Sequence, residues 1–351
     1  MSRIILLCLL MIAALAGADR TGAQLLKESD TWLKSPEGIA QLANLLGYQT
    51  PVGGWCKAYD ARTPRDVTAG AKSYGGWNGT PTIDNGATYS EIRVLARAFV
   101  LSGTESYQQA CLRGLTFLLD RQYDNGGWPQ RSPKDPGDHD YGTHITFNDH
   151  AMTEVLALMR DVAAAKSPFA WITEAQRTAA NIAYDRGVDC LLRSQITVAG
   201  ILSAWCQQHD AMTLAPTTAR AYELPCVASS ESARIVLLLM QIEKPDERVR
   251  RAVDAAHAWF LRSRIDGKKI VEQDNDRVLV DSPDAPPLWA RCYDLATDQP
   301  FFCDRDGVKR AALSEITRER RAGYAWYGTW GEQVLRDHTK WLTRTTGKPA
   351  P

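Results

Sequence analysis

The stretch ACLRGLTFLLDRQ, residues 110–122, returns at residues 183–195 as AYDRGVDCLLRSQ, with Ala, Arg-Gly, Leu-Leu and Gln at identical spacing. A weaker third copy, AVDAAHAWFLRSR, fills residues 252–264. Each copy carries one apolar stripe at the period of an α-helix that packs against a core on one side. Such a recurrence indicates a repeat architecture, which decides the fold before any single motif is considered.

Each repeated helix has a partner helix upstream. TIDNGAT (residues 82–88) and the similar TFNDHAM (residues 146–152) open the first two partners, and SSES (residues 229–232) opens the third. Three helical hairpins result. We expect an all-α fold in which they stack as an incomplete α/α toroid with long loops, with the helix N-termini gathered on one face. Residues 270–272 and 277–280 predict one small β-hairpin.

Residues 1–18 have the layout of a secretory signal peptide. A single positive charge precedes an apolar run over residues 4–15, and small residues follow where cleavage would occur. The run is too short to span a bilayer, and the alternative is a buried N-terminal helix. We therefore expect a secreted or periplasmic protein in which residues 19–351 form a single domain.

Overall composition excludes some classes of partner. Lys and Arg together number 41, as do Asp and Glu, so no global charge draws the chain to nucleic acid or to a membrane. Any charge selectivity must be local. Beyond residue 18 the chain has seven cysteines without CxxC spacing, which argues against structural zinc and indicates small core residues.

Two partner helices begin with doubled polar residues, Asp84-Asn85 and Asn148-Asp149. Helix capping is the ordinary interpretation of either pair alone, but one oxygen-bearing side chain would suffice for a cap. In a toroid the two helix starts would lie side by side, and carboxylates that converge usually have a cation between them. Because hard oxygen ligands favour calcium over zinc, Asp84 and Asp149 are candidate ligands of Ca²⁺.

Tryptophans and arginines accompany the loops. Glycine pairs precede Trp55, Trp77 and Trp128, which either plug the core or line a rim on which sugar rings stack. Several arginines adjoin aromatic or glycine-rich loop sequence, namely Arg220, Arg291, Arg305, Arg320 and Arg321. They are either structural ion pairs or forks that bind carboxylates bidentately. An acidic, cation-binding cleft served by arginines suits an anionic sugar polymer.

Taken as a set, five motifs resemble the pectate lyases of polysaccharide lyase family ten. They are NGGWPQ (125–130), HITFND (144–149), AWC with QHD (204–206 and 208–210), ARAYE (219–223) and FFCDRDG (301–307), and the resemblance covers about residues 25–341. It implies calcium-dependent cleavage of α-1,4-polygalacturonate, which is de-esterified pectin, by β-elimination to 4,5-unsaturated oligogalacturonates. We expect a monomer that binds neither nucleic acid nor membrane.

Carried over position by position, the resemblance implies a role for each candidate residue. Arg305 would be the catalytic base, Asp149 the main calcium ligand and Asp84 its neighbour. The remaining candidates would contact substrate: Asn85, Trp128, Arg220, Arg291 and Arg321. His150 departs from the family pattern, in which a smaller or amide residue is expected after the aspartate.

The chemistry leaves two alternatives open. Because guanidinium normally has a pKa above about 12, an arginine base predicts an alkaline optimum. An inverting glycoside hydrolase could instead use Asp84 and Asp149 as its acid and base. A non-catalytic pectin-binding protein could use the tryptophan rim alone.

Overall fold

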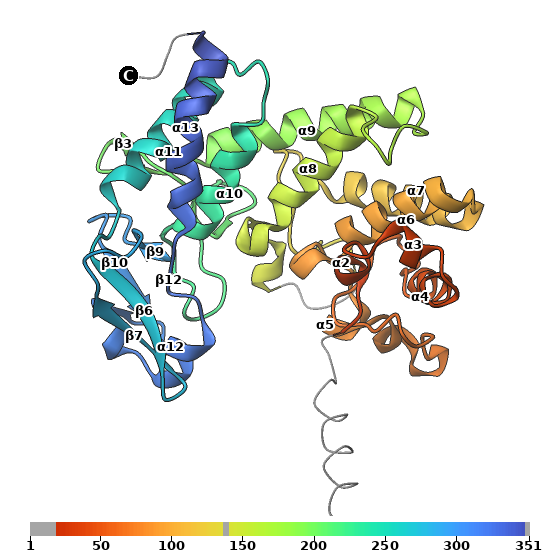
Figure 1. Cartoon of the computed structure of the whole chain (residues 1–351), viewed down its shortest axis with the longest axis horizontal. Helices are drawn as coiled ribbons and strands as arrows, with labels where there is room; N and C mark the ends of the chain where they lie inside the picture. The colour runs from red at the N-terminus through yellow and green to blue at the C-terminus, as the bar shows by residue number, and fades with distance from the viewer. Residues whose placement is uncertain (1–18, 136–139, 348–351) are drawn as a thin grey trace, which may run out of the picture. The chain divides into compact units, whose positions relative to one another are not determined.

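The computed structural model describes residues 19–135 and 140–347, so the predicted signal peptide lies outside the described residues. Packing divides the described chain into two compact units (Figure 1). The first runs to Thr82 and resumes over Gly86–Phe117, and the second contains Ile83–Asn85 and the described chain from Leu118 onward. All the candidate site residues belong to the second unit. The expected single domain over residues 19–351 stays a prediction.

The first unit is helical. Its elements are α2 (Gly22–Leu25), α3 (Asp30–Leu33), α4 (Pro36–Gly47), the 3-10 helix η1 (Val67–Tyr74), α5 (Gly76–Gly79), α6 (Tyr89–Ser102) and the part of α7 (Glu105–Arg121) up to Phe117. α6 and α7 form the first predicted hairpin. A methyl group at Gly114 of α7 would lie 2.7 Å from Ile92 of α6, so glycine in the first copy of the repeat permits this close packing.

The second unit contains the other two predicted hairpins, α8 with α9 and α10 with α11, and α13 packs beside the last (Figure 1). Its helices, including 3-10 turns, are η3 (Tyr141–Thr143), η4 (Asn148–His150), α8 (Ala151–Ala163), α9 (Glu174–Ser194), α10 (Ser229–Leu239), α11 (Glu247–Arg262), η5 (Leu313–Glu315), α12 (Arg318–Gly323) and α13 (Trp330–Thr346). The short turn η2 (Asp84–Gly86) begins in this unit. Helix accounts for about 49% of the protein and strand for 12%. Helices therefore predominate, but the prediction of an all-α fold with one small β-hairpin missed the other short strands.

Short strands connect these helices. They are β1 (Ile145–Thr146), β2 (Thr197–Val198), β3 (Ile201–Leu202), β4 (Gln208–His209), β5 (Val227–Ala228), β6 (Lys268–Gln273), β7 (Asp276–Asp281), β8 (Trp289–Ala290), β9 (Cys292–Tyr293), β10 (Pro300–Cys303), β11 (Lys309–Arg310) and β12 (Tyr327–Gly328). The largest sheet is antiparallel, in the order β11-β10-β9-β5. β6 and β7 form the predicted hairpin, whose turn residues Asp274 and Asn275 both have positive φ, as a tight hairpin turn requires.

A glutamine amide ahead of each repeated helix joins a loop to that helix. In each case Nε2 donates to a carbonyl four to eight residues ahead and to the first alanine of the following copy: Gln49 to Gly53 and Ala110, Gln122 to Gly126 and Ala183, and Gln195 to Ser203 and Ala252. All six distances lie between 2.7 and 2.9 Å. The glutamines at the ends of the first two copies therefore couple neighbouring repeats.

Three of the loop tryptophans are structural. Trp55, Trp128 and Trp205 are all 0% exposed, and each indole N–H donates to a carbonyl of the preceding helix, those of Leu45, Leu118 and Leu191. The prediction that Trp128 contacts substrate is wrong, because a fully buried indole presents no face to a sugar ring. The core-plug interpretation holds for these three residues.

The remaining sequence features agree with the structure. The seven cysteines of the described chain are all buried, as expected of core residues. Within residues 19–135 and 140–347, no helix combines the length and apolar character needed to cross a bilayer.

Candidate active site

Two loops present the predicted acidic pairs in the same conformation. Asp84 and Asn85 lie in η2, and Asn148 and Asp149 lie in η4. In each loop the first residue is buried and the second is exposed, with φ of +50° at Asn85 and +49° at Asp149. Asn85 Nδ2 donates to Asp84 Oδ2 at 3.2 Å, and Asn148 Nδ2 lies 3.4 Å from Asp149 Oδ2. The sequence similarity between the two loops therefore reflects a repeated backbone structure.

Neither pair caps the helix that follows it. The N-cap residues are Thr88 for α6 and His150 for α8, and neither cap makes a side-chain hydrogen bond to its helix. His150, which departs from the family pattern, occupies the position in the second loop that Gly86 occupies in the first. Its φ is +64°, and that of Gly86 is +92°. A left-handed conformation costs a non-glycine residue about 1 kcal/mol. Strain retained at Asp149 and His150 points to a function for this loop rather than to capping.

The two loops lie within electrostatic range of each other. Although Asp149 is exposed in its loop, neighbouring protein atoms displace part of the water around its carboxyl and raise its pKa, and the negative charge of Asp84 raises it further. Arg291 and Arg220 act in the opposite direction. Carboxylates that oppose each other's ionisation form an arrangement that a cation relieves. Among the described residues no three His, Cys, Asp or Glu side chains form a metal-binding group.

Arg291 is a buried arginine beside the second acidic loop. It follows β8, and its Nη2 donates to Glu231 Oε1 at 2.6 Å and to Asn148 Oδ1 at 3.3 Å. Burial is the largest single effect and opposes its charge, but Glu231 together with Tyr324, Cys292 and Asp149 raises the pKa of Arg291. Its guanidinium carbon lies 4.7 Å from the ring centre of Tyr324. Arg291 is therefore a fixed positive charge directly behind Asn148 and Asp149.

Arg220 and Tyr324 meet at Glu223. Arg220 Nε donates to Glu223 Oε2 at 2.7 Å, and Nη2 bonds to the other oxygen of the same carboxylate. The hydroxyl of Tyr324 donates to Glu223 Oε1 at 3.1 Å and accepts from Gln207 Nε2 at 2.8 Å. The side chain of Arg220 remains 41% exposed, so one face of the guanidinium is accessible to a ligand.

Arg305 lies on the surface and is held by Glu319. Its Nε and Nη2 donate to the two oxygens of Glu319 at 3.1 and 3.0 Å. This pairing raises the pKa of Arg305. The guanidinium carbons of three arginines surround the buried ring of Tyr222: Arg320 at 4.5 Å, Arg220 at 4.9 Å and Arg305 at 5.7 Å. Arg305 and Arg220 therefore share the ring of Tyr222 as a neighbour, and of these two arginines Arg220 is the one whose charge acts on Asp149.

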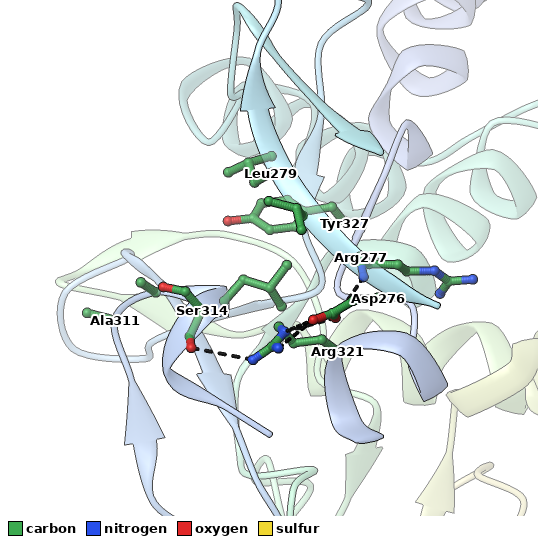
Figure 2. A pocket seen from close by; sticks show the side chains of 10 residues that line it. Asp276, Arg277, Leu279, Ala311, Ser314, Arg321 and Tyr327 are labelled. Atoms are coloured by element: carbon green, nitrogen blue, oxygen red, sulfur yellow. Dashed lines mark hydrogen bonds and ion pairs between the residues drawn. The ribbon is translucent and has the colours of Figure 1, made fainter. Parts of the chain in front are cut away.

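Arg321 has a structural role, contrary to the prediction that it binds uronate. It belongs to helix α12, and its Nε and Nη2 bind the carboxylate of Asp276 on β7 (Figure 2). Its Nη1 donates to the carbonyl of Ile316. Every nitrogen of the guanidinium is used within the protein. Arg321 lines a cavity with apolar residues such as Leu279 and Tyr327, and it ties the β6–β7 hairpin to α12 (Figure 2).

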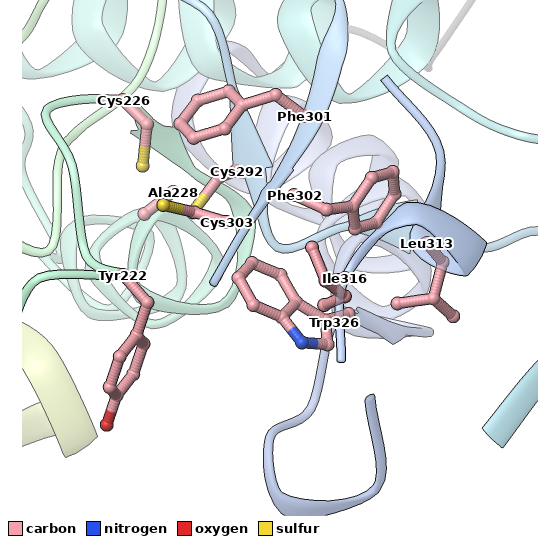
Figure 3. Close-up of a cluster of buried hydrophobic side chains, with 10 residues drawn as sticks. All are labelled: Tyr222, Cys226, Ala228, Cys292, Phe301, Phe302, Cys303, Leu313, Ile316 and Trp326. Atoms are coloured by element: carbon pink, nitrogen blue, oxygen red, sulfur yellow. The ribbon is translucent and has the colours of Figure 1, made fainter. Parts of the chain in front are cut away.

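A buried hydrophobic cluster underlies the arginine-bearing segments (Figure 3). It contains Tyr222, Cys226, Ala228, Cys292, Phe301, Phe302, Cys303, Leu313, Ile316 and Trp326. Arg291 immediately precedes Cys292 on β9, and Arg305 follows Cys303 at the end of β10. The apolar residues of these adjacent strands thus fix the places from which the two arginines emerge.

The structure brings together Asp84, Asn85, Asp149, Arg220 and Arg291, and it excludes Arg321 and Trp128. Arg305 lies beside Tyr222 and Glu319, and its approach to the two acidic loops stays a prediction. Sequence reasoning missed the residues that pair with these arginines, namely Glu223, Glu231 and Glu319, and the two tyrosines, Tyr222 and Tyr324. Glu223 and Tyr222 belong to the ARAYE motif and Glu231 belongs to SSES, so the sequence motifs include these residues. Nothing in those motifs indicates which arginines they contact. These features define a predominantly helical protein in which two acidic loops adjoin a buried and a partly exposed arginine.

Comparison with known proteins identifies the family. The pectic acid lyase family matches residues 49–335. A family 10 polysaccharide lyase from Cellvibrio cellulosa is 32% identical over 91% of this chain and 95% of its own, with a TM-score of 0.78. An aspartate-to-alanine mutant of a family 10 polysaccharide lyase from that organism, in complex with trigalacturonic acid, matches at 32% identity over 91% of this chain and 96% of its own, with a TM-score of 0.77. A search of the curated proteins gave no match.

The chain belongs to the pectic acid lyases of polysaccharide lyase family ten. It is therefore a pectate lyase, as the sequence resemblance indicated, and the family excludes the glycoside hydrolase and the non-catalytic binding protein.

Proposed function

We propose that this enzyme is a calcium-dependent pectate lyase that cleaves α-1,4-polygalacturonate by β-elimination to 4,5-unsaturated oligogalacturonates. The observation that carries the proposal is the pair of matching acidic loops, whose Asp84 and Asp149 interact electrostatically beside Arg220 and Arg291. The trigalacturonic acid bound to the related lyase supports a galacturonate substrate. Negative protein groups beside positive ones suit a polyanion that is bound partly through a metal ion.

The donor set of the two loops fits Ca²⁺. Asp84 and Asp149 would hold the ion. Asn85, which occupies the same exposed position in its loop as Asp149 does in the other, would contact the ion or the sugar. All three side chains offer oxygen, which Ca²⁺ prefers, and Ca²⁺ takes six to eight oxygen ligands. The small number of protein carboxylates leaves room for substrate carboxylate and water. When bound, the ion would neutralise the uronate carboxylate and thereby increase the acidity of the C5 proton.

The protein's own groups would perform the rest of the reaction. Arg305, in its neutral form, would accept the proton from C5 of the galacturonate. The electron pair of that C–H bond forms the C4–C5 double bond, and the bond from C4 to the glycosidic oxygen breaks. The departing oxygen takes a proton from solvent, and no water is consumed. Arg291 and the exposed face of Arg220 would orient uronate carboxylates, since guanidinium forks recognise carboxylates bidentately.

Three further expectations belong to the same proposal. The three hairpins are arranged as an incomplete α/α toroid, which the repeated glutamine bridges between successive copies support. Residues 1–18 direct the protein out of the cytoplasm, so that it is secreted or periplasmic and meets its polymeric substrate. The enzyme acts as a monomer on polygalacturonate.

An assay of polygalacturonate with and without calcium tests the proposed function. The unsaturated product absorbs ultraviolet light, so absorbance should rise with Ca²⁺ and stop rising after a chelator is added. Arg305→Ala should lose nearly all of this activity while it still binds polygalacturonate. Cleavage that yields reducing ends without a rise in absorbance would refute elimination, and full activity in chelator would refute the metal.

A further inference from the structure

Glu319 binds two arginines at once. Its carboxylate accepts Nε and Nη2 of Arg305 at 3.1 and 3.0 Å, and it accepts Nε of Arg320 at 2.7 Å together with Arg320 Nη2. The two pairs lower the pKa of Glu319 to about 2. Glu319 therefore stays ionised throughout the range in which a pectate lyase works.

The two arginines differ in how firmly they are held. The side chain of Arg320 is 7% exposed, it lies 4.5 Å from the ring centre of Tyr222, and its backbone carbonyl accepts the indole N–H of Trp326. The side chain of Arg305 is 64% exposed and reaches Glu319 from the loop after β10. Arg305 can therefore leave the carboxylate, while Arg320 stays behind to neutralise it.

No other carboxylate binds the guanidinium of Arg305 in the described chain. Asp304 accepts the backbone N–H groups of Arg305 and Thr317, and Asp306 pairs with Arg310. Of the groups packed against Arg305, Glu319 favours its protonated form, Arg320 opposes it, and Tyr222 presents its ring. The balance of charge around Arg305 is thus set mainly by Glu319.

We propose that Glu319 is a positioning residue of the lyase reaction, which holds Arg305 protonated and against Tyr222 until substrate arrives and thereby sets the lower pH limit of activity. The inference rests on the proposed role of Arg305 as the base. A carboxylate beside a base stabilises the form that cannot accept a proton. Removal of the charge of Glu319 should therefore make Arg305 a better base at lower pH.

The test uses Glu319→Gln, with Glu315→Gln as a matched control. Glu315 is exposed in η5 of the same segment, and its Oε2 accepts the backbone N–H of Ala312, a bond that an amide oxygen can keep. kcat/KM on polygalacturonate is measured against pH for both variants and the wild type. On the acid limb the rate of Glu319→Gln should exceed that of the wild type about threefold, the size expected when an exposed ion pair is lost.

A second measurement does not depend on activity. Phenylglyoxal attacks the unprotonated guanidine, so mass spectrometry of the labelled peptide reports how readily Arg305 gives up its proton. Without substrate, Arg305 should be labelled about threefold faster in Glu319→Gln than in the wild type or in Glu315→Gln. Glu319→Asp retains the charge on a shorter side chain. Its kcat/KM on the acid limb should therefore lie between that of Glu319→Gln and that of the wild type.

An unchanged acid limb together with unchanged labelling, or equal changes in Glu315→Gln, would overturn the inference. Thermal unfolding of each variant shows whether the fold is retained. If Arg305→Ala keeps full activity, the base in the proposed function is misassigned, and the labelling rates of the Glu319 variants then decide separately whether Glu319 holds Arg305.

Discussion

Arg291 stacks on Tyr324 with its guanidinium carbon 4.7 Å from the ring centre, and its Nη2 simultaneously bonds Glu231. The same Tyr324 hydroxyl reaches Glu223, the partner of Arg220. Two arginines from distant segments are thus held by one tyrosine and two buried glutamates. Their positions are fixed before any ligand binds, which lowers the entropy lost when a charged sugar is oriented.

Glu231→Gln should destabilise the protein by about 3 kcal/mol, because it leaves the buried charge of Arg291 without its partner. Urea unfolding measures the change. The control is Glu154→Gln, which breaks the exposed pair with Arg234 at 2.9 Å and should cost less than about 1 kcal/mol. Equal costs for the two variants would show that burial of the Arg291 pair has no energetic consequence.

Asp149→Asn should remove most of the stabilisation that calcium gives. In the wild type, Ca²⁺ at a hundred times its Kd should add about 2.7 kcal/mol to the free energy of unfolding, and a chelator should reverse the gain. Without calcium the variant should be no less stable than the wild type, since repulsion from Asp84 is relieved. Asp185→Asn, at an exposed position on α9, serves as control. A calcium response preserved in Asp149→Asn would contradict the assigned ligand.

Gln195→Met should cost about 2 kcal/mol, since the carbonyls of Ser203 and Ala252 both lose the buried amide that donates to them. The matched control is Gln109→Met, whose exposed amide bonds only the side chain of Glu105 among the described contacts and should change stability by less than about 0.5 kcal/mol. Denaturant midpoints of both variants give the comparison. A small effect at Gln195 would mean that the glutamine bridge does not couple the repeats.

The buried Glu91 should make stability fall as pH rises. Burial raises its pKa from 4.5 to about 7, despite hydrogen bonds from Tyr59 and the backbone N–H of Gly22. The folded protein holds this proton more tightly than the unfolded chain, so the stabilisation is complete below pH 4.5 and is lost as pH rises through 7. Across that window the loss amounts to about 3 kcal/mol.

Glu91→Gln keeps an oxygen acceptor and carries no proton to lose, so its free energy of unfolding should not fall over this window. At pH 9 the variant should be more stable than the wild type. The measurement is urea unfolding at pH 5, 7 and 9, with the exposed Glu105→Gln of α7 as control. Parallel pH dependence in the wild type and Glu91→Gln would disprove the assignment.

The sequence predicted the elements of the fold because their causes are local. The apolar stripe of each repeated helix, the β-hairpin predicted from residues 270–272 and 277–280 and the doubled polar pairs all depend on a few neighbouring residues. The repeat also placed Gln122 and Gln195 at matching positions, although their bridging role became visible only in three dimensions.

By itself, then, the chain determined its helical repeats, its acidic loops and its family. The tertiary structure decided which arginines are available to a ligand, because each of Arg291, Arg305 and Arg321 pairs with a carboxylate that is distant from it in the sequence. No local sequence pattern predicts such a pair. Arg291 meets Glu231 across 60 positions of sequence, and Arg321 meets Asp276 across 45. Arg305 alone of these three remains largely exposed, since its carboxylate lies on the surface and is shared with Arg320.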